Sequence, residues 1–291
     1  MLAMESLCGQ RWVWACFYIQ NQFDCSRSSM EAFIDMKSIP VLGTMIYNRP
    51  DYLERMIRSI DYPIGKLVVV LNAVTAEIAA TADLIRRLYP NVIIYNPGFN
   101  QPKPVNLGFA GGWNYVLRNH MAEWVLVVGN DVQFHPGQLQ KIAEYYARHE
   151  NDSPPMGVVN TSMGWHVHGI TRHGLNVLGY LDENMYPCYY DDCDHDYRHT
   201  LAQRKNLVSY PAEGECHVHI HHEGSATSRN LPPEKAERMA KAFERNEEYY
   251  SRKWGGTQTK ETFQTPFNNP ALSIRDWSLE PGRWQLNSLD G

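Results

Sequence analysis

From residue 38 to about residue 149, short apolar runs alternate with longer segments in which hydrophobic and polar residues are mixed. Four short apolar runs, at 39–46, 66–71, 91–95 and 124–128, are typical of strands buried on both faces. Between them, apolar residues recur every three to four positions, which predicts amphipathic helices at 50–60, 75–89, 109–121 and 136–149. Asn48 is expected to cap the first helix. Strands alternating with helices predict an α/β fold with a mostly parallel sheet flanked by helices.

The second half of the chain is less regular. Its pattern predicts short strands at 158–159 and 174–180, and helices at 191–203 and 231–254. We therefore expect three parts: an N-terminal extension of unknown role at 1–37, one domain at 38–256, and an irregular C-terminal tail at 257–291.

Charge and cysteine content narrow the class of protein. The formal net charge is −5 over 291 residues, which argues against a nucleic-acid partner held by broad phosphate neutralisation. The six cysteines are scattered, which favours a reducing compartment over a disulfide scaffold. No apolar run approaches the roughly 20 residues that span a bilayer, so we expect no transmembrane segment. We expect a cytoplasmic protein, and peripheral contact with a membrane stays open.

Polar side chains follow the predicted parallel strands. In such sheets, ligands bind beyond the carboxyl ends of the strands. The sequence therefore predicts a shared site at this edge, and the alternative is that each residue caps its own helix. The candidates are Thr44, Tyr47, Asn48, Arg49, Asn72, Asn130 and Asp131.

A glycine-rich segment, Asn106-Leu107-Gly108-Phe109-Ala110-Gly111-Gly112-Trp113-Asn114, opens a predicted helix. Glycines at a helix start let a ligand approach the backbone N–H groups, which is a common way to bind an anion. The spacing fits neither a dinucleotide fingerprint nor a P-loop. Close packing of the helix is the alternative explanation.

Two groups of acidic residues are candidates for chemistry. Asp131 ends an apolar strand and could bind a hard divalent cation, which needs only one or two protein carboxylates beside substrate phosphates, or it could cap a helix. Asp191, Asp192, Asp194 and Asp196 crowd a helix start. Mutual repulsion should raise the pKa of at least one, which suits a general base. The alternative is a solvated acidic helix start.

Histidines at 217, 219, 221 and 222 form an alternating run. In a strand, the first three would share one face, as metal ligands do. A zinc site that also uses Cys188, Cys193 and Cys216 is a rival reading, although the spacing matches no common zinc motif.

These segments together resemble the GT-A glycosyltransferases of family 2, especially the rhamnosyl- and galactofuranosyltransferase-like branch. The resemblance covers about Ile39 to Gly256. The segment Asn106 to Gly112, with Asn114, is close to the family's Asn-x-Gly-Phe-x-Gly-Gly signature. Asp191-Asp192-Cys193-Asp194 with Arg198 is similar to its Glu-Asp-x-Asp-x-x-x-Arg stretch.

Three further segments carry the resemblance. Residues 44–49 look like the family's nucleotide-contacting start, 221–227 like its His-x-x-Gly-x-x-Ser/Thr segment, and 249–255 like the Lys-Trp-Gly segment near the end of the domain. One motif departs: the family's Asp-x-Asp reads Gly129-Asn130-Asp131, so only the second acid remains.

The resemblance implies a GT-A fold and an inverting, metal-dependent hexosyl- or deoxyhexosyltransferase. Asp192 would be the base, assisted by Asp191, and Mn²⁺ or Mg²⁺ would bind Asp131 with His221 or His219. The donor would be a nucleotide-diphospho-sugar, with UDP or dTDP favoured, and the acceptor a glycan or glycoconjugate. The implied donor-binding residues are Thr44, Tyr47, Asn48, Arg49, Asn72, Asn106, Gly108, Phe109, Gly111, Gly112, Asn114, Asn130 and Asp131.

Acceptor contacts are expected between 163 and 190, where Trp165, His166 and Tyr189 could stack on sugar rings or pack in the core. Two other functions stay open. One is a zinc-dependent hydrolase, and the other is a catalytically inactive relative that binds a nucleotide or glycan.

Overall fold

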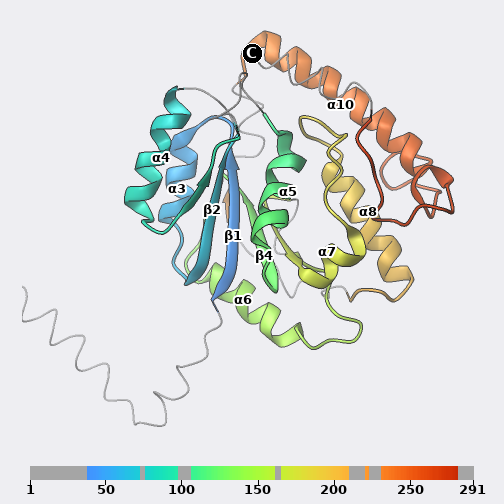
Figure 1. The fold of residues 1–291 in the computed structure, drawn as a ribbon, viewed down its shortest axis with the longest axis horizontal. Coiled ribbons are helices and arrows are strands. Elements are labelled where there is room, and N and C mark those ends of the chain that lie inside the picture. Colours follow the sequence, from blue (N-terminus) through green and yellow to red (C-terminus); the bar gives the residue numbers. More distant parts are fainter. Residues whose placement is uncertain are drawn as a thin grey trace, which may run out of the picture. The chain divides into compact units, whose positions relative to one another are not determined.

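The computed structural model describes residues 38–72, 76–97, 106–160, 165–209, 220–222 and 231–280. A six-stranded sheet of order β3-β2-β1-β4-β7-β6 forms its centre (Figure 1). Strands β1 to β4 run parallel, and β7 and β6 complete the sheet antiparallel to their neighbours. The strands of this sheet are β1 (Ile39–Ile46), β2 (Ile64–Leu71), β3 (Ile93–Tyr95), β4 (Trp124–Gly129), β6 (Val158–Asn160) and β7 (Val167–Thr171).

Helices cover both faces of the sheet, as the predicted α/β class requires (Figure 1). Alternate residues of β2 point to opposite faces: Leu67 and Val69 pack in one core cluster, and Val68 and Val70 pack in another. The helices are α3 (Pro50–Arg58), α4 (Ala76–Leu88), α5 (Gly108–His120), α6 (Gln138–His149), α7 (Arg172–Leu178), α8 (Asp191–Arg204) and α10 (Pro233–Trp254).

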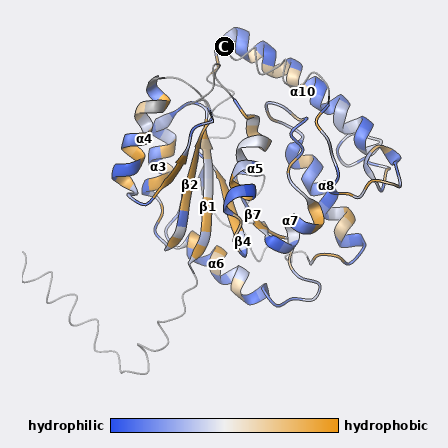
Figure 2. Cartoon of the chain, viewed as in Figure 1, coloured by the Kyte–Doolittle hydropathy of each residue, from blue (hydrophilic) through white to orange (hydrophobic). Residues whose placement is uncertain are grey.

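The hydropathy of the strands explains this layering. Figure 2 shows the strands of the large sheet as mostly hydrophobic, whereas the helices mix hydrophobic and hydrophilic residues. The core cluster that contains Val68 and Val70 also contains Trp113, Val116 and Leu117 of α5, which pack against that face of the sheet. A third core cluster joins α8 to α10, where Leu201 and Trp254 are both fully buried. The predicted α/β class with a mostly parallel sheet is therefore confirmed.

Two predictions about local structure are wrong. The segment 174–180 is not a strand, because residues 172–178 form helix α7. The Thr171 hydroxyl accepts a hydrogen bond from the Gly174 N–H and caps that helix, and Gly179, with φ 78°, ends it. Asn48 is not the cap of α3 either, since Arg49 occupies that position with φ 58°.

The boundaries of the predicted parts stay predictions. Residues 1–37 and 281–291 lie outside the described residues. Residues 257–280 are irregular apart from a short 3-10 turn, η1 (Pro266–Asn268), and they pack on the domain, where Trp277 Nε1 donates to the Tyr180 carbonyl at 3.2 Å. Among the described residues, no helix combines the length and apolar character needed to cross a membrane.

Candidate active site

The parallel strands bring their polar carboxyl ends together. Register places Ile46 beside Leu71 and Met45 beside Gly129, so the residues that follow these strands meet at one edge of the sheet. Asn130 Nδ2 donates to the Asn48 carbonyl at 3.4 Å, which ties the ends of β4 and β1. Thr44 is fully buried within the sheet, and its Oγ1 has no hydrogen-bond partner among the described residues, so a contact with a donor stays a prediction.

Tyr47 and Arg49 have protein partners at this edge. The Arg49 guanidinium pairs with Asp51 at 2.8 Å and lies 3.7 Å from the ring centroid of Tyr52. The Tyr47 hydroxyl accepts a hydrogen bond from Lys235 Nζ at 3.1 Å, which connects β1 to the start of α10. Both side chains shape the edge, and a contact with a donor stays a prediction.

Asp131 lies in the turn between β4 and β5 (Val132–Phe134). Its carboxylate lies over Gly129, where an added Cβ would come within 2.9 Å of Asp131 Oδ1. Strand β8 (Ile220–His222) pairs with β5 and sets His221 opposite Gln133, two residues from Asp131. Two of the three predicted metal ligands, Asp131 and His221, thus lie at or beside the β5–β8 pair.

No group of three or more histidine, cysteine or acidic residues arranged to hold a metal occurs in the described part of the chain. His219 and Cys216 lie outside the described residues. Cys188 and Cys193 are free thiols, and burial, with the nearby carboxylates, raises the pKa of both. The zinc site stays an open alternative, because a bound zinc ion itself displaces the thiol proton.

The glycine-rich turn is held by protein contacts. The N–H groups of Leu107 and Gly108 donate to the side-chain oxygens of Asn72 and Asn106 at 2.7 and 2.8 Å, and Phe109 N–H donates to the Pro187 carbonyl at 2.6 Å. These donors are therefore not available to an anion. The contacts also join the end of β2 to the segment that precedes α8.

The glycines of α5 serve close packing. A Cβ at Gly112 would lie 2.5 Å from Met45 Sδ, and one at Gly108, with φ 70°, would lie 2.8 Å from Tyr186 Cδ2. At Gly111 the nearest atom would be Leu107 Cβ, at 3.1 Å. The packing explanation accounts for these contacts, and a donor contact at this turn stays a prediction.

Asn114 holds the segment that leads toward α8. It is fully buried, its Nδ2 donates to the Leu181 carbonyl at 2.8 Å, and its Oδ1 accepts from the Leu181 N–H at 3.0 Å. The same Nδ2 reaches Glu183 Oε1 at 3.0 Å. Asn114 therefore links α5 to residues 181–183, and nothing in these contacts requires a ligand.

The acid pair Asp191–Asp192 opens α8. Asp191 is only 2% exposed, and its Oδ2 has no hydrogen-bond partner within the described residues. Burial, reinforced by repulsion from Asp192 and Asp194, raises the Asp191 pKa well above its usual value. Asp192 is half-buried, and its Oδ1 accepts a hydrogen bond from the Cys193 N–H at 2.8 Å. The structure thus combines a buried acid with a more accessible one.

The turn before this pair has an unusual backbone. Tyr189 and Tyr190 have φ values of 77° and 69°, a region that costs non-glycine residues free energy. Asn246 of α10 holds the turn, because its Nδ2 donates to the carbonyls of Cys188 and Tyr189 at 2.8 and 3.2 Å. The α10 helix therefore keeps the acid pair in place.

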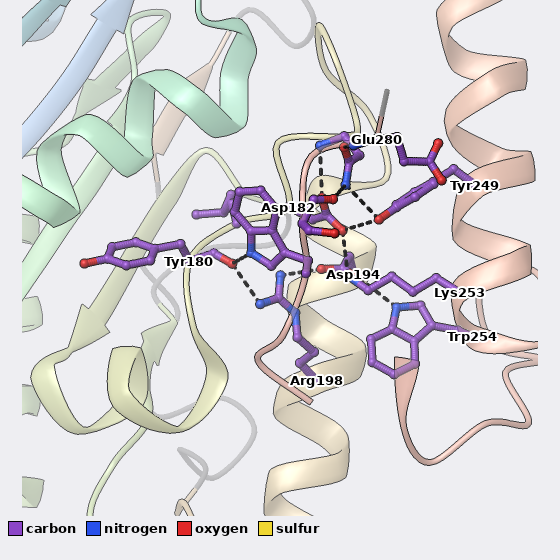
Figure 3. Close-up of polar contacts among 12 residues, drawn as sticks. Tyr180, Asp182, Asp194, Arg198, Tyr249, Lys253, Trp254 and Glu280 are labelled. Atoms are coloured by element: carbon purple, nitrogen blue, oxygen red, sulfur yellow. Dashed lines mark hydrogen bonds and ion pairs between the residues drawn. The ribbon is translucent and has the colours of Figure 1, made fainter. Parts of the chain in front are cut away.

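Asp194 has a structural environment unlike that of the acid pair. It is fully buried, and Trp254 Nε1 donates to its Oδ1 at 2.7 Å (Figure 3). Burial would raise its pKa, but the positive charges of Arg198 and Lys253 outweigh that effect and lower it. Sequence reasoning missed Lys253 and its second partner Asp182, although the Lys-Trp-Gly segment was a usable signal.

The predicted acceptor residues lie around α8. Trp165 Nε1 donates to Asp196 Oδ2 at 3.2 Å, and its ring stacks on His168 with centroids 3.8 Å apart. The Tyr189 ring lies 5.5 Å from that of Phe243. The backbone carbonyl of His166 accepts a hydrogen bond from the Gly129 N–H at 2.8 Å, so the His166 backbone has a structural role.

The structure also brings three imidazoles together in a buried cluster, which the sequence did not predict as a group. His168 and His195 are each 1% exposed, with ring centroids 5.7 Å apart, and His199 is 4% exposed. The ring nitrogens of His168 and His195 have no hydrogen-bond partner in the described part of the chain. Desolvation lowers the pKa of His168 to about 3 and that of His199 to about 4. These rings are therefore neutral at pH 7.

Residues 43–185 match the family model described as "Glycosyl transferase family 2". This match confirms the predicted resemblance to that family, without singling out a branch. No curated protein matches the sequence.

The similar solved structures include three at low identity. The mannosyltransferase PcManGT from Pyrobaculum calidifontis, in complex with GDP-Man and Mn2+, is 17% identical with a TM-score of 0.42, covering 57% of this chain and 52% of its own. TarS 1-349 from S. aureus is 16% identical with a TM-score of 0.42, covering 55% of each chain. GalNAc-T7 with UDP, GalNAc and Mn2+ is 8% identical with a TM-score of 0.43, covering 56% of this chain and 41% of its own. The matches thus span about half the length of each of these structures.

Proposed function

Because residues 43–185 match the model of glycosyltransferase family 2, we propose that this protein transfers a sugar from a nucleotide-diphosphate donor to a hydroxyl group of a glycan or glycoconjugate, with inversion at the anomeric carbon. The observation that supports this most directly is the acid pair at the start of α8, where Asp191 is buried and Asp192 is more accessible. Two neighbouring acids in different environments suit proton transfer at neutral pH.

Asp192 is the proposed general base. It takes the proton of the acceptor hydroxyl while that oxygen forms a bond to the anomeric carbon. The bond between the anomeric carbon and the phosphate oxygen breaks on the opposite face, and the nucleoside diphosphate leaves with the bonding electrons. Asp191, whose raised pKa favours its protonated form, donates a hydrogen bond to one of the two substrates.

The sheet edge is the proposed donor site. Asn48 and Asn130 meet there, and Asp131 follows directly. The donor set fits a divalent cation in part: Asp131 offers one carboxylate, and His221 is exposed at a neighbouring position of the β5–β8 pair. Mn²⁺ or Mg²⁺ bound there would supply Lewis-acid neutralisation of the departing diphosphate, whose oxygens would complete the coordination.

The donor sugar is a hexose or deoxyhexose in this proposal, carried by UDP or dTDP. The start of α5 touches the 186–187 segment, two residues before the strained turn that presents Asp192. This contact supports placing the donor and the base at one site. Trp165, His166 and Tyr189 are the proposed acceptor contacts.

The test starts with donor binding by the full-length protein. Thermal shifts are measured with UDP-, dTDP- and GDP-sugars, each with Mn²⁺, Mg²⁺ or EDTA. A ligand at about 100 times its dissociation constant stabilises the fold by roughly 2.7 kcal/mol, which is readily detected. A shift with one nucleotide class that EDTA removes supports the metal-assisted transferase. No shift with any donor refutes it.

Transfer is then assayed with the matching donor and a panel of glycans. Asp192→Asn should abolish transfer and keep the donor-induced thermal shift, because the amide cannot take a proton but keeps the shape of the side chain. Asp83→Asn, an exposed acid on α4, is the matched control and should behave as the unmodified protein. Loss of donor binding in Asp192→Asn would contradict its role as base. Donor binding without transfer or donor hydrolysis by the unmodified protein would favour an inactive relative.

A further inference from the structure

Lys253 lies fully buried in the last turn of α10 and binds two carboxylates from distant segments. Its Nζ is 2.7 Å from Asp182 Oδ2 and 2.6 Å from Asp194 Oδ1, and all three side chains have no solvent exposure (Figure 3). A lysine is almost never buried without charged partners, because desolvation of an ammonium costs more than packing returns. Its position is therefore fixed by the two carboxylates.

The first carboxylate, Asp182, belongs to a segment that is hydrogen-bonded to α5. Asp182 also accepts a hydrogen bond from the Tyr249 hydroxyl at 2.8 Å. Its neighbour Leu181 exchanges two hydrogen bonds with Asn114 of α5, at 2.8 and 3.0 Å. Thus α5, which starts with the glycine-rich turn, is connected to Lys253 through a short, fully hydrogen-bonded segment.

The second carboxylate, Asp194, lies on the same helix as the proposed base Asp192. Asp194 lies two residues after Asp192 in the first turn of α8. It is held by Lys253, by the Trp254 indole N–H, and by the guanidinium of Arg198. A shift of Asp194 would carry the first turn of α8 with it, because helix backbone hydrogen bonds make that turn a rigid unit.

The charges of this network balance. Two carboxylates, Asp182 and Asp194, face two cations, Lys253 and Arg198, and only Lys253 contacts both acids. Without the ammonium, the carboxylates would repel each other in a low-dielectric interior. The segment that carries Asp182 and the helix that carries Asp194 would then separate.

We propose that Lys253 is a positioning residue for the transfer reaction: by joining Asp182 to Asp194, it fixes the acid pair Asp191–Asp192 relative to the glycine-rich start of α5. This inference rests on the proposed function. Lys253 touches no substrate, and its contribution is to the geometry in which the base meets the donor.

The test uses a charge-balanced variant. Lys253→Met alone would leave an uncompensated buried carboxylate, so it is combined with Asp182→Asn, which removes one charge of each sign and keeps side-chain volume. Lys241→Met is the matched control, because Lys241 lies on the same helix in an exposed pair with Glu237. Tm, donor KM and kcat for transfer are measured for each protein.

A positioning role predicts a selective effect on turnover. In the double variant, kcat should fall roughly 100-fold, the loss that an ångström-scale misplacement causes. Donor KM should stay within about threefold, and Tm within about 4 °C, of the unmodified protein. Lys241→Met should keep all three values. Asp182→Asn alone is the second variant. It leaves one buried cation in excess, so its Tm should fall, and its kcat should fall while donor KM is kept.

Other results overturn the proposal. An unchanged kcat in the double variant, or in Asp182→Asn if the double variant does not fold, means that Lys253 only stabilises the fold. A joint fall of Tm, donor affinity and kcat points to the same structural role. If the unmodified protein binds no donor and transfers no sugar, the proposed function itself fails, and this inference fails with it.

Discussion

The buried imidazole cluster predicts that the protein loses stability as the pH falls. Desolvation lowers the pKa of His168 to about 3, whereas an unfolded chain would titrate this side chain near 6.5. Between these values the unfolded state binds a proton that the folded state does not, so acid favours unfolding. The effect is absent well above pH 6.5 and grows as the pH falls toward about 3.

The magnitude follows from the two pKa values. Lowering the pH from 7 to 5 should cost about 2 kcal/mol through His168 alone. His199, with a pKa lowered to about 4 by burial, should cost about 2 kcal/mol more over the same interval. Burial and the neighbouring cations lower the pKa of His195 well below its usual value, so this ring adds to the loss of stability in acid. Asp191 acts in the opposite direction, because its raised pKa favours the folded state in acid.

A difference between variants isolates the histidine contribution. Urea unfolding of the unmodified protein and of His168→Asn is followed by tryptophan fluorescence at pH 7 and pH 5. The pH-dependent loss of unfolding free energy should be about 2 kcal/mol smaller in His168→Asn, whatever its stability at pH 7. His135→Gln, which changes an exposed histidine, is the control and should keep the full loss. An equal pH dependence in His168→Asn would refute the assignment of the acid sensitivity to this ring.

Three further variants test the site and its frame. Asp131→Asn should remove the difference between Mn²⁺ and EDTA in donor-induced thermal shifts, and a retained difference would exclude Asp131 as ligand. Gly108→Ala should destabilise the fold by about 2–5 kcal/mol in urea unfolding, because it combines positive φ with contacts under 3 Å to Tyr186 and Pro187; an unchanged midpoint would contradict this packing. Asn72→Ala should cost roughly 1–3 kcal/mol by leaving the half-buried Leu107 N–H unpaired, and a smaller loss would mean water replaces the amide.

Much of the fold could be read from local patterns. The first strand, 39–46, was predicted with its observed bounds, because a short and continuous apolar run is typical of a parallel strand buried on both faces. The helices at 108–120 and 191–204 differ from the predicted ranges by a residue at most. Residues 167–171 were missed as a strand, since that segment contains His168 and Gly169 and its pairing with β4 is antiparallel.

The sequence by itself also singled out three candidate segments: the polar ends of the strands, the glycine-rich turn and the acids of α8. What it could not decide was how each residue is used. Asn114 and Gly112 belong to a signature that implies donor contacts, and Asn72 was expected at the donor from its place at a strand end. The structure shows each of them in protein contacts, and their donor contacts stay predictions.

Only the tertiary structure separated Asp194 from its neighbours Asp191 and Asp192. All three are aspartates in one helical turn, and local sequence gives them the same charge and spacing. Asp194 meets Lys253 and Trp254, which lie 59 and 60 residues further along the chain, whereas burial and repulsion from Asp192 and Asp194 raise the pKa of Asp191. The state of a carboxylate depends on the charges and water within a few ångströms of it, and those neighbours are set by chain folding rather than by adjacent residues.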